Sequence, residues 1–230
     1  MEHRRPSRVG RVLYRHPAVW KVQFLLAREA RRLPPVHAAL RRLFSDDLRK
    51  LNDTLASVGL ERDYWMWSGI VLGWAREGRI LLHDDMDADF AILDCNWERF
   101  EQIAPVLERA GFRGHLRYRN YEGQTTQLVF VRHGTRFEFF RMDRRGEMLQ
   151  YYVYGQVDGA FQELRRSVPY GELEEFSFLC RRWLKMRDHE RELKWIYGDW
   201  RVPDVGWRYL DNDGDGETVQ RPWDPATAHW

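Results

Sequence analysis

The sequence of 230 residues contains only two cysteines, Cys95 and Cys180. They do not form a metal-spaced pair such as C-x-x-C, so neither a zinc site nor a disulfide scaffold is expected, and a reducing compartment fits. No apolar run approaches the roughly 18–20 residues that a membrane-spanning helix needs. The N-terminus has arginines but lacks the apolar core and cleavage site of a signal peptide. These absences predict a cytoplasmic protein without a transmembrane span.

The net charge of +2 is unevenly distributed, because residues 1–50 carry 13 Lys and Arg against 4 Asp and Glu. That end therefore has a charge of +9, and the rest of the chain has −7. Apolar residues recur at helical spacing between Pro17 and Arg32, with Trp20 and Phe24 among them. This pattern predicts an amphipathic helix that either docks on the domain or contacts a membrane surface. Because the positive charge lies beside apolar residues, no nucleic-acid partner is expected.

Periodicity divides the chain into a basic helical segment (1–35), a main domain (36–205) and an irregular tail (206–230). The expected helices cover Val36–Val58, with a break near Ser45, and Ile70–Arg76, Trp97–Ala110 and Leu173–Ile196. The expected strands are Tyr64–Trp67, Asp87–Leu93, and four consecutive antiparallel segments: His115–Tyr121, Thr125–Arg132, Arg136–Met142 and Met148–Tyr154. This order predicts an α/β or α+β fold, a mixed sheet with flanking helices and an antiparallel extension.

An acidic stretch, H-D-D-M-D-A-D-F-A, carries the strongest chemical signal in the sequence. On a strand, Asp85, Asp87 and Asp89 share one face, and the residues between them share the other. Three carboxylates within ~14 Å of strand repel one another unless something neutralises them. A divalent cation such as Mg²⁺ is the simplest compensation. An exposed acidic turn without function is the alternative.

The segment before the acidic stretch suits phosphate binding. Ser68 and Gly69 form a small-residue turn at the expected start of a helix, where free backbone N–H groups bind anions. Further along, Arg76 offers a bidentate phosphate contact, and its alternative is a surface salt bridge.

The string G-I-V-L-G-W-A-R-E-G-R-I, followed by the aspartates, resembles the LicD/fukutin family of the nucleotidyltransferase superfamily. The matching residues are Gly69, Leu72, Gly73, Arg76 and Gly78. Near the end, Y-G-D-W with a later proline is similar to the family's C-terminal element, so the resemblance spans about residues 45–205. It implies a nucleotidyltransferase-like fold, with Ser68, Gly69, Gly73 and Arg76 at the substrate.

The resemblance also implies a metal site, with Asp85, Asp87, Asp89 and Glu138 as ligands. Two departures bear on it: Ile70 stands where the family has Thr, and the register of the aspartates is ambiguous. The metal pair is either Asp85/Asp87 or Asp87/Asp89. We favour the second pair, because apolar residues continue the strand after Asp89. Glu138, on a later strand, is the expected third carboxylate, and a solvent-facing glutamate is its alternative.

By resemblance, Asp87, Asp89 and Glu138 are the catalytic residues of a phosphotransferase that depends on Mg²⁺ or Mn²⁺. It would move a phospho-alcohol, such as phosphocholine or a polyol phosphate, from a CDP-linked donor to a glycan or teichoic-acid-like acceptor. Two alternatives stay open: a nucleotidyltransferase that moves NMP, and a non-catalytic glycan- or membrane-binding protein with the same fold. The N-terminal helix is the predicted site of peripheral membrane contact.

Overall fold

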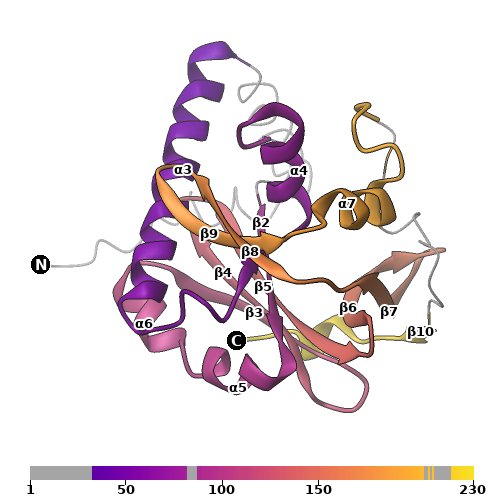
Figure 1. Ribbon diagram of the computed structural model, residues 1–230. Coiled ribbons are helices and arrows are strands. Elements are labelled where there is room, and N and C mark those ends of the chain that lie inside the picture. Colours follow the sequence, from indigo (N-terminus) through magenta and orange to yellow (C-terminus); the bar gives the residue numbers. More distant parts are fainter. Residues whose placement is uncertain (1–32, 82–86, 205–206, 208, 210–218) are drawn as a thin grey trace, which may run out of the picture. The chain divides into compact units, whose positions relative to one another are not determined.

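The computed structural model describes residues 33–81, 87–204, 207, 209 and 219–230 (Figure 1). The chain divides into two compact units, Met1–Phe44 and Ser45–Trp230. Helix α3 (Pro34–Ala56) begins in the first unit and ends in the second, without the break expected near Ser45. The basic helix expected between Pro17 and Arg32 lies outside the described residues.

Strand β5 (Thr135–Arg145) is the centre of an eight-stranded sheet in the second unit. It runs parallel to β2 (Asp87–Leu93) on one side and antiparallel to β4 (Thr125–Arg132) on the other. The short β1 (Trp65–Met66) pairs with β2, and β3 (Arg113–Arg119) pairs with β4. A parallel pair needs a crossover connection, and the one from β2 to β5 contains α5 (Asp94–Glu101), α6 (Ala104–Arg109) and the β3–β4 hairpin.

An antiparallel extension follows from the end of β5. The last residues of β5 pair with β6 (Met148–Val157), which pairs along its length with β7 (Ala160–Pro169). Both residues of the turn between them, Asp158 and Gly159, have positive φ angles, of 51° and 80°, as tight hairpin turns require. Strand β10 (Val219–Pro222) pairs with the other edge of β7. The tail expected to be irregular from residue 206 therefore contributes a strand.

The prediction of a helix over Leu173–Ile196 is wrong for most of its length. The structure has a separate hairpin there, β8 (Leu173–Phe178) and β9 (Arg181–Met186), and only α7 (His189–Tyr197) is helical. The two turn residues between β8 and β9 have φ angles of 53° and 56°. The expected helix Trp97–Ala110 is likewise divided into α5 and α6.

Aromatic side chains fill the core on both faces of the sheet. On one face Phe90, Phe139 and Trp183 pack with ring centroids 5.2–6.3 Å apart, and on the other Trp67 packs at 4.8 Å against Tyr151. The described part of the second unit is thus a mixed α/β sheet with flanking helices and an antiparallel extension, which confirms the predicted fold class. None of the described helices has the length and apolar character needed to cross a membrane.

Candidate active site

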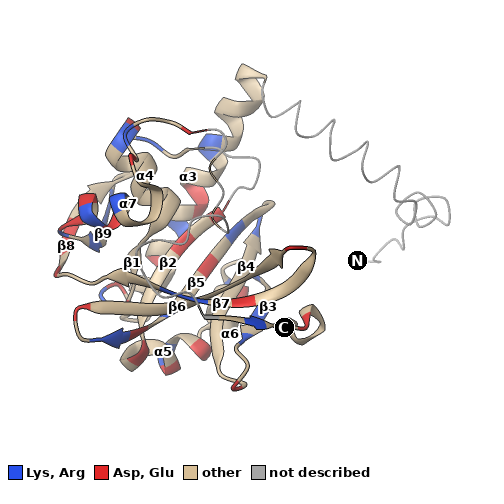
Figure 2. Ribbon diagram, turned by 90° about the vertical axis from the view of Figure 1, so that its right-hand side faces the viewer, with Lys and Arg blue, Asp and Glu red and all other residues tan. Residues whose placement is uncertain are grey.

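Two aspartates of β2 and one glutamate of β5 are neighbours on one face of the sheet. Ala88 and Phe90 are fully buried on the opposite face of β2, so Asp87 and Asp89 point the same way. In the parallel ladder Asp89 is the direct partner of Glu138. The structure therefore brings these three predicted residues together, and their roles stay predictions. Figure 2 shows charged positions of both signs on the adjacent strands β2 and β5.

One arginine balances part of this negative charge. The guanidinium of Arg136 lies 3.1 Å from a carboxylate oxygen of Asp87 and 3.1 Å from one of Glu138. The amide of Gln127 on β4 donates a hydrogen bond to Glu138. Burial, followed by the like charges of Asp87 and Glu138, raises the pKa of Asp89 well above its usual range.

The donor set suits a hard divalent cation, because Mg²⁺ and Mn²⁺ prefer carboxylate oxygens. Over the described ranges, which omit 82–86, no group of three or more His, Cys, Asp or Glu side chains is arranged to hold a metal ion. Asp85, a predicted ligand, lies outside these ranges, so the choice between the Asp85/Asp87 and Asp87/Asp89 pairs stays open. In this structure the guanidinium of Arg136 provides positive charge beside the carboxylates of Asp87 and Glu138.

Helix α4 (Ser68–Glu77) begins beside Asp89. The backbone N–H of Trp67 donates to the carbonyl of Asp89 at 3.1 Å. The hydroxyl of Ser68 lies 2.8 Å from that of Tyr197. The same side chain counters the rise in the pKa of Asp89. Ser68 has a φ of 54°, a left-handed conformation that is uncommon outside glycine. The first N–H groups of α4, which have no partner within a helix, therefore lie next to the acidic residues.

The two glycines of the predicted substrate site have different surroundings. A Cβ added at Gly69 would meet nothing within 4 Å, which leaves room for a ligand at the start of α4. A Cβ added at Gly73 would lie 2.6 Å from the carbonyl oxygen of Arg79 and 3.0 Å from the side chain of Leu81. Gly73 is thus required by the close approach of the following backbone.

Arg76 lies in the last turn of α4, at the opposite end of the helix from Gly69. At ~1.5 Å per residue, its Cα is about 10 Å further along the axis. Its guanidinium donates to the carbonyl of Trp200 at 3.4 Å and lies 3.6 Å from a carboxylate oxygen of Glu77. The structure therefore gives Arg76 intramolecular partners and does not place it beside the three carboxylates.

A buried acid on α7 was not anticipated from the sequence. Glu192 is 1% exposed, and neither carboxylate oxygen has a hydrogen-bond partner of acceptable geometry. Burial raises the pKa of Glu192 to about 8, against the opposing effects of Lys185 and the backbone N–H of Ser68. Glu192 is therefore protonated at neutral pH, close to the start of α4.

Sequence reasoning also missed Gln127, Arg136 and Tyr197 as parts of the site. Arg136 precedes Glu138 by two residues on one strand, so strand alternation could have placed both on one face. Tyr197 belongs to the Y-G-D-W string, but its hydrogen bond to Ser68 spans 129 positions of the sequence. No local sequence pattern predicts a contact between residues so far apart in the chain.

The described part of the chain combines a mixed sheet with paired carboxylates on β2, a third carboxylate on β5 and a helix that starts beside them. Residues 61–164 match the family model for LicD/FKTN/FKRP, nucleotidyltransferase domain. Over this stretch, which is just under half of the chain, the sequence is similar to the LicD/fukutin family. No curated protein sequence matches the chain.

Among solved structures, the chain is similar to the antibiotic-resistance factor ANT(2'')-Ia, known from a solution structure. The two are 17% identical, with 73% of this chain and 78% of that chain covered and a TM-score of 0.44.

Proposed function

We propose that the protein transfers a phospho-alcohol from a CDP-linked donor to a hydroxyl of a glycan or teichoic-acid-like acceptor, with Mg²⁺ or Mn²⁺ bound at Asp87, Asp89 and Glu138. The observation that carries this proposal is the meeting of three carboxylates, from β2 and β5, beside the start of α4. The family match supports the transferase class. The identity of the transferred group rests on the family resemblance.

The carboxylate oxygens of Asp87, Asp89 and Glu138 are of the type that a hard divalent cation prefers, which supports the proposed metal site. When bound, the cation would neutralise the donor diphosphate and its leaving group. The chain's own residues then have distinct tasks. The N–H groups at the start of α4 would hold donor phosphate, where the absence of a Cβ at Gly69 leaves space. Arg136 would keep the acids from repelling one another before substrate arrives.

The reaction itself needs one proton acceptor. The acceptor oxygen forms a new bond to the phosphorus of the phospho-alcohol, the bond from that phosphorus to the bridging oxygen breaks, and CMP leaves. The hydroxyl proton passes to a carboxylate.

The test is hydrolysis of CDP-linked alcohols in ¹⁸O-labelled water, with Mn²⁺ or with EDTA. Attack at the phospho-alcohol phosphorus places the label in the released phospho-alcohol, as we expect. Label in CMP would show nucleotidyl transfer and would overturn the proposal. Absence of metal-dependent CDP-ligand binding by calorimetry would instead favour the non-catalytic alternative.

A further inference from the structure

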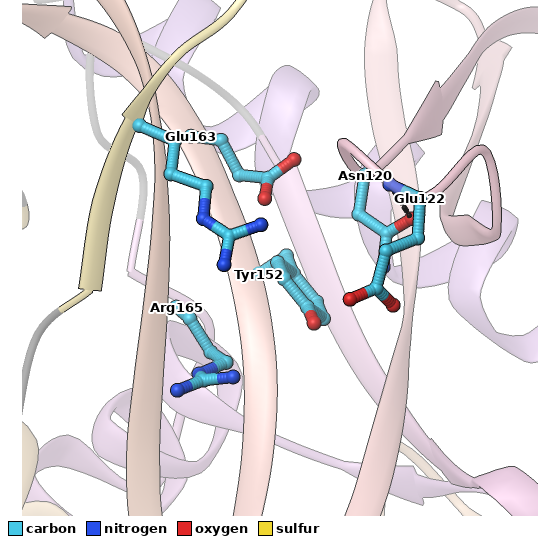
Figure 3. Close-up of a pocket in the computed structure, with 6 residues that line it drawn as sticks. Asn120, Glu122, Tyr152, Glu163 and Arg165 are labelled. Atoms are coloured by element: carbon cyan, nitrogen blue, oxygen red, sulfur yellow. Dashed lines mark hydrogen bonds between the residues drawn. The ribbon is translucent and has the colours of Figure 1, made fainter.

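The antiparallel extension carries a small polar cavity next to a cluster of aromatic rings. The cavity is lined by Asn120, Glu122, Tyr152, Glu163, Arg165 and Arg221, with a volume of about 10 Å³. That is room for about one water molecule or one hydroxyl group, and not for a whole sugar ring. Figure 3 shows Tyr152 between Arg165 on one side and Glu122 on the other.

Hydrogen bonds hold two of the side chains that line the cavity, and the lining is balanced in charge. Glu163 is 5% exposed and accepts the backbone N–H of Tyr121 at 2.7 Å. The side chain of Asn120 accepts the N–H groups of Glu122 and Gln124, which fixes the turn between β3 and β4. Two guanidinium and two carboxylate groups cancel in charge. Such a lining matches a neutral hydroxyl group, which both donates and accepts, better than an anion.

The ring cluster, defined as Tyr118, Tyr154, Phe161 and Trp223, adjoins this cavity. On a strand, residues two apart share a face, so Tyr154 lies on the same face as Tyr152, and Phe161 on the same face as Glu163. Trp223 comes directly after β10, and its backbone N–H donates to the carbonyl of Phe161 at 3.1 Å. Tyr118 and Tyr154 stack at 4.9 Å, and Trp223 lies 4.7 Å from Tyr154. Phe161 is 41% exposed. Apolar ring faces beside placed polar groups form the type of surface that binds small ligands.

The ring cluster is also continuous with the carboxylates. Tyr118 on β3 is the ladder partner of Gln127, which donates to Glu138. After burial, the charge of Glu138 is the next contribution that raises the pKa of Tyr118. A ligand lying on the ring cluster would therefore extend toward the reacting carboxylates.

We propose that the ring cluster and the adjoining cavity bind a neutral sugar unit of the acceptor. The C–H face of a pyranose ring would lie on the aromatic rings, and one hydroxyl would enter the cavity between Arg165, Arg221 and Glu163. This inference rests on the proposed function, since it assigns the acceptor to a place in the fold. The sugar surface and the phosphate-transfer site are nevertheless separate sets of side chains.

The experiment measures binding of maltotriose, cellotriose and N-acetylchitotriose by saturation-transfer NMR and calorimetry. Phe161→Ala and Arg221→Gln change exposed side chains and should each weaken binding of a trisaccharide about tenfold, the loss expected for one good contact. Arg62→Gln, which removes an exposed arginine paired with Glu175, is the matched control and should bind like the wild type. Release of CMP into water by Arg62→Gln should match that of the wild type.

Equal trisaccharide binding by the wild type and both variants would overturn the inference, and so would a wild type that binds none of the three sugars. A wild type that binds a trisaccharide but consumes no CDP-linked donor would refute the proposed function and leave the sugar surface standing. Displacement of the sugar by inorganic phosphate would identify an anion site and would also overturn the inference.

Discussion

Asp89 illustrates how a single residue can be costly for the unliganded fold and valuable for function. It is buried beside two other carboxylates, so its charged form is disfavoured without a cation. Replacing it with Asn should leave the metal-free protein as stable or slightly more stable, because a repulsion is relieved. Metal should stabilise the wild type by ~2.7 kcal/mol at a hundredfold excess over its dissociation constant, and this gain should shrink in Asp89→Asn together with donor turnover.

Thermal unfolding with and without Mn²⁺, combined with donor turnover, checks this expectation. If Asp89→Asn keeps both the metal-induced shift and the activity, the pair to test becomes Asp85/Asp87. If Glu138→Gln alone is silent, the third ligand lies elsewhere, and the two-aspartate part of the proposal survives.

Glu192 should make stability depend on pH. Its pKa is about 8 in the folded protein and 4.5 ordinarily, so between these values the folded state holds a proton that the unfolded state has lost. Stability therefore falls as pH rises through this window: the contribution is complete below about pH 4.5 and lost by about pH 8. Glu192→Gln cannot ionise. At pH 9 its free energy of unfolding should exceed that of the wild type by on the order of a few kcal/mol, and its melting temperature should be higher. The two proteins should be equally stable at pH 5.

The matched control is Glu190→Gln, on the same helix but exposed and paired with Arg201. Its melting temperature should follow the wild type at every pH. Parallel pH slopes for Glu192→Gln and the wild type would contradict a buried, protonated Glu192.

The sequence predicted those site residues that lie close together on one strand, because the alternation of side chains along a strand is a local pattern. Asp87 and Asp89 are two residues apart, so the alternation of the strand predicts that they share a face. Glu138 needed the family resemblance, because the parallel register that joins it to Asp89 spans 49 positions. Glu192 gave no signal, since a glutamate in a charged helix usually faces solvent.

Among the elements, α4 separates the packing role of glycine from its proposed binding role. Gly73→Ala should destabilise the protein by about 1–3 kcal/mol, because the new Cβ meets the backbone of Arg79 at 2.6 Å. Gly69→Ala has free space and should unfold within about 0.5 kcal/mol of the wild type, yet it should weaken donor binding if phosphate approaches the helix start. Chemical denaturation and calorimetry with a CDP-linked ligand measure the two effects.

The outcomes separate cleanly because each variant adds one methyl group to the same helix. Equal stability of Gly73→Ala and Gly69→Ala would contradict the packing account. Unchanged donor affinity in Gly69→Ala would remove the start of α4 from the phosphate site.

The elements that the sequence predicted best were those with clear periods and ordinary turns. Thr125–Arg132 was located to the residue, since polar turns bound it on both sides. The β8–β9 hairpin was mistaken for a helix because its turn uses Leu179 and Cys180, both with positive φ, where Asn and Gly are usual. Strand β7 was missed although Asp158-Gly159 marks its hairpin turn. The β8–β9 hairpin is instead supported by packing with distant residues, since Trp183 on β9 contacts Tyr64 and Phe90, and no local pattern in the sequence reveals such contacts.

For the whole molecule, the charge distribution suggests two functional ends, with an acidic body for cations and a basic N-terminus for anionic surfaces. Residues 1–50 carry +9 and the rest −7. The basic segment predicted to be helical lies outside the described residues, so its membrane role is still a prediction from the sequence.

We expect the full chain to float with vesicles containing anionic lipid, and a chain lacking residues 1–32 to remain unbound. That deletion leaves every described element in place. Rising salt should weaken binding by the full chain, because exposed charges are screened beyond ~10 Å at 0.1 M. Vesicles of neutral lipid give the baseline, and Arg62→Gln with Arg187→Gln, which removes two exposed positive charges from the body, should still float. If the truncated chain floats as well as the full chain, the basic segment is not the membrane contact. If flotation survives at high salt on neutral lipid, insertion of the apolar stripe, with Trp20 and Phe24, replaces charge attraction as the cause.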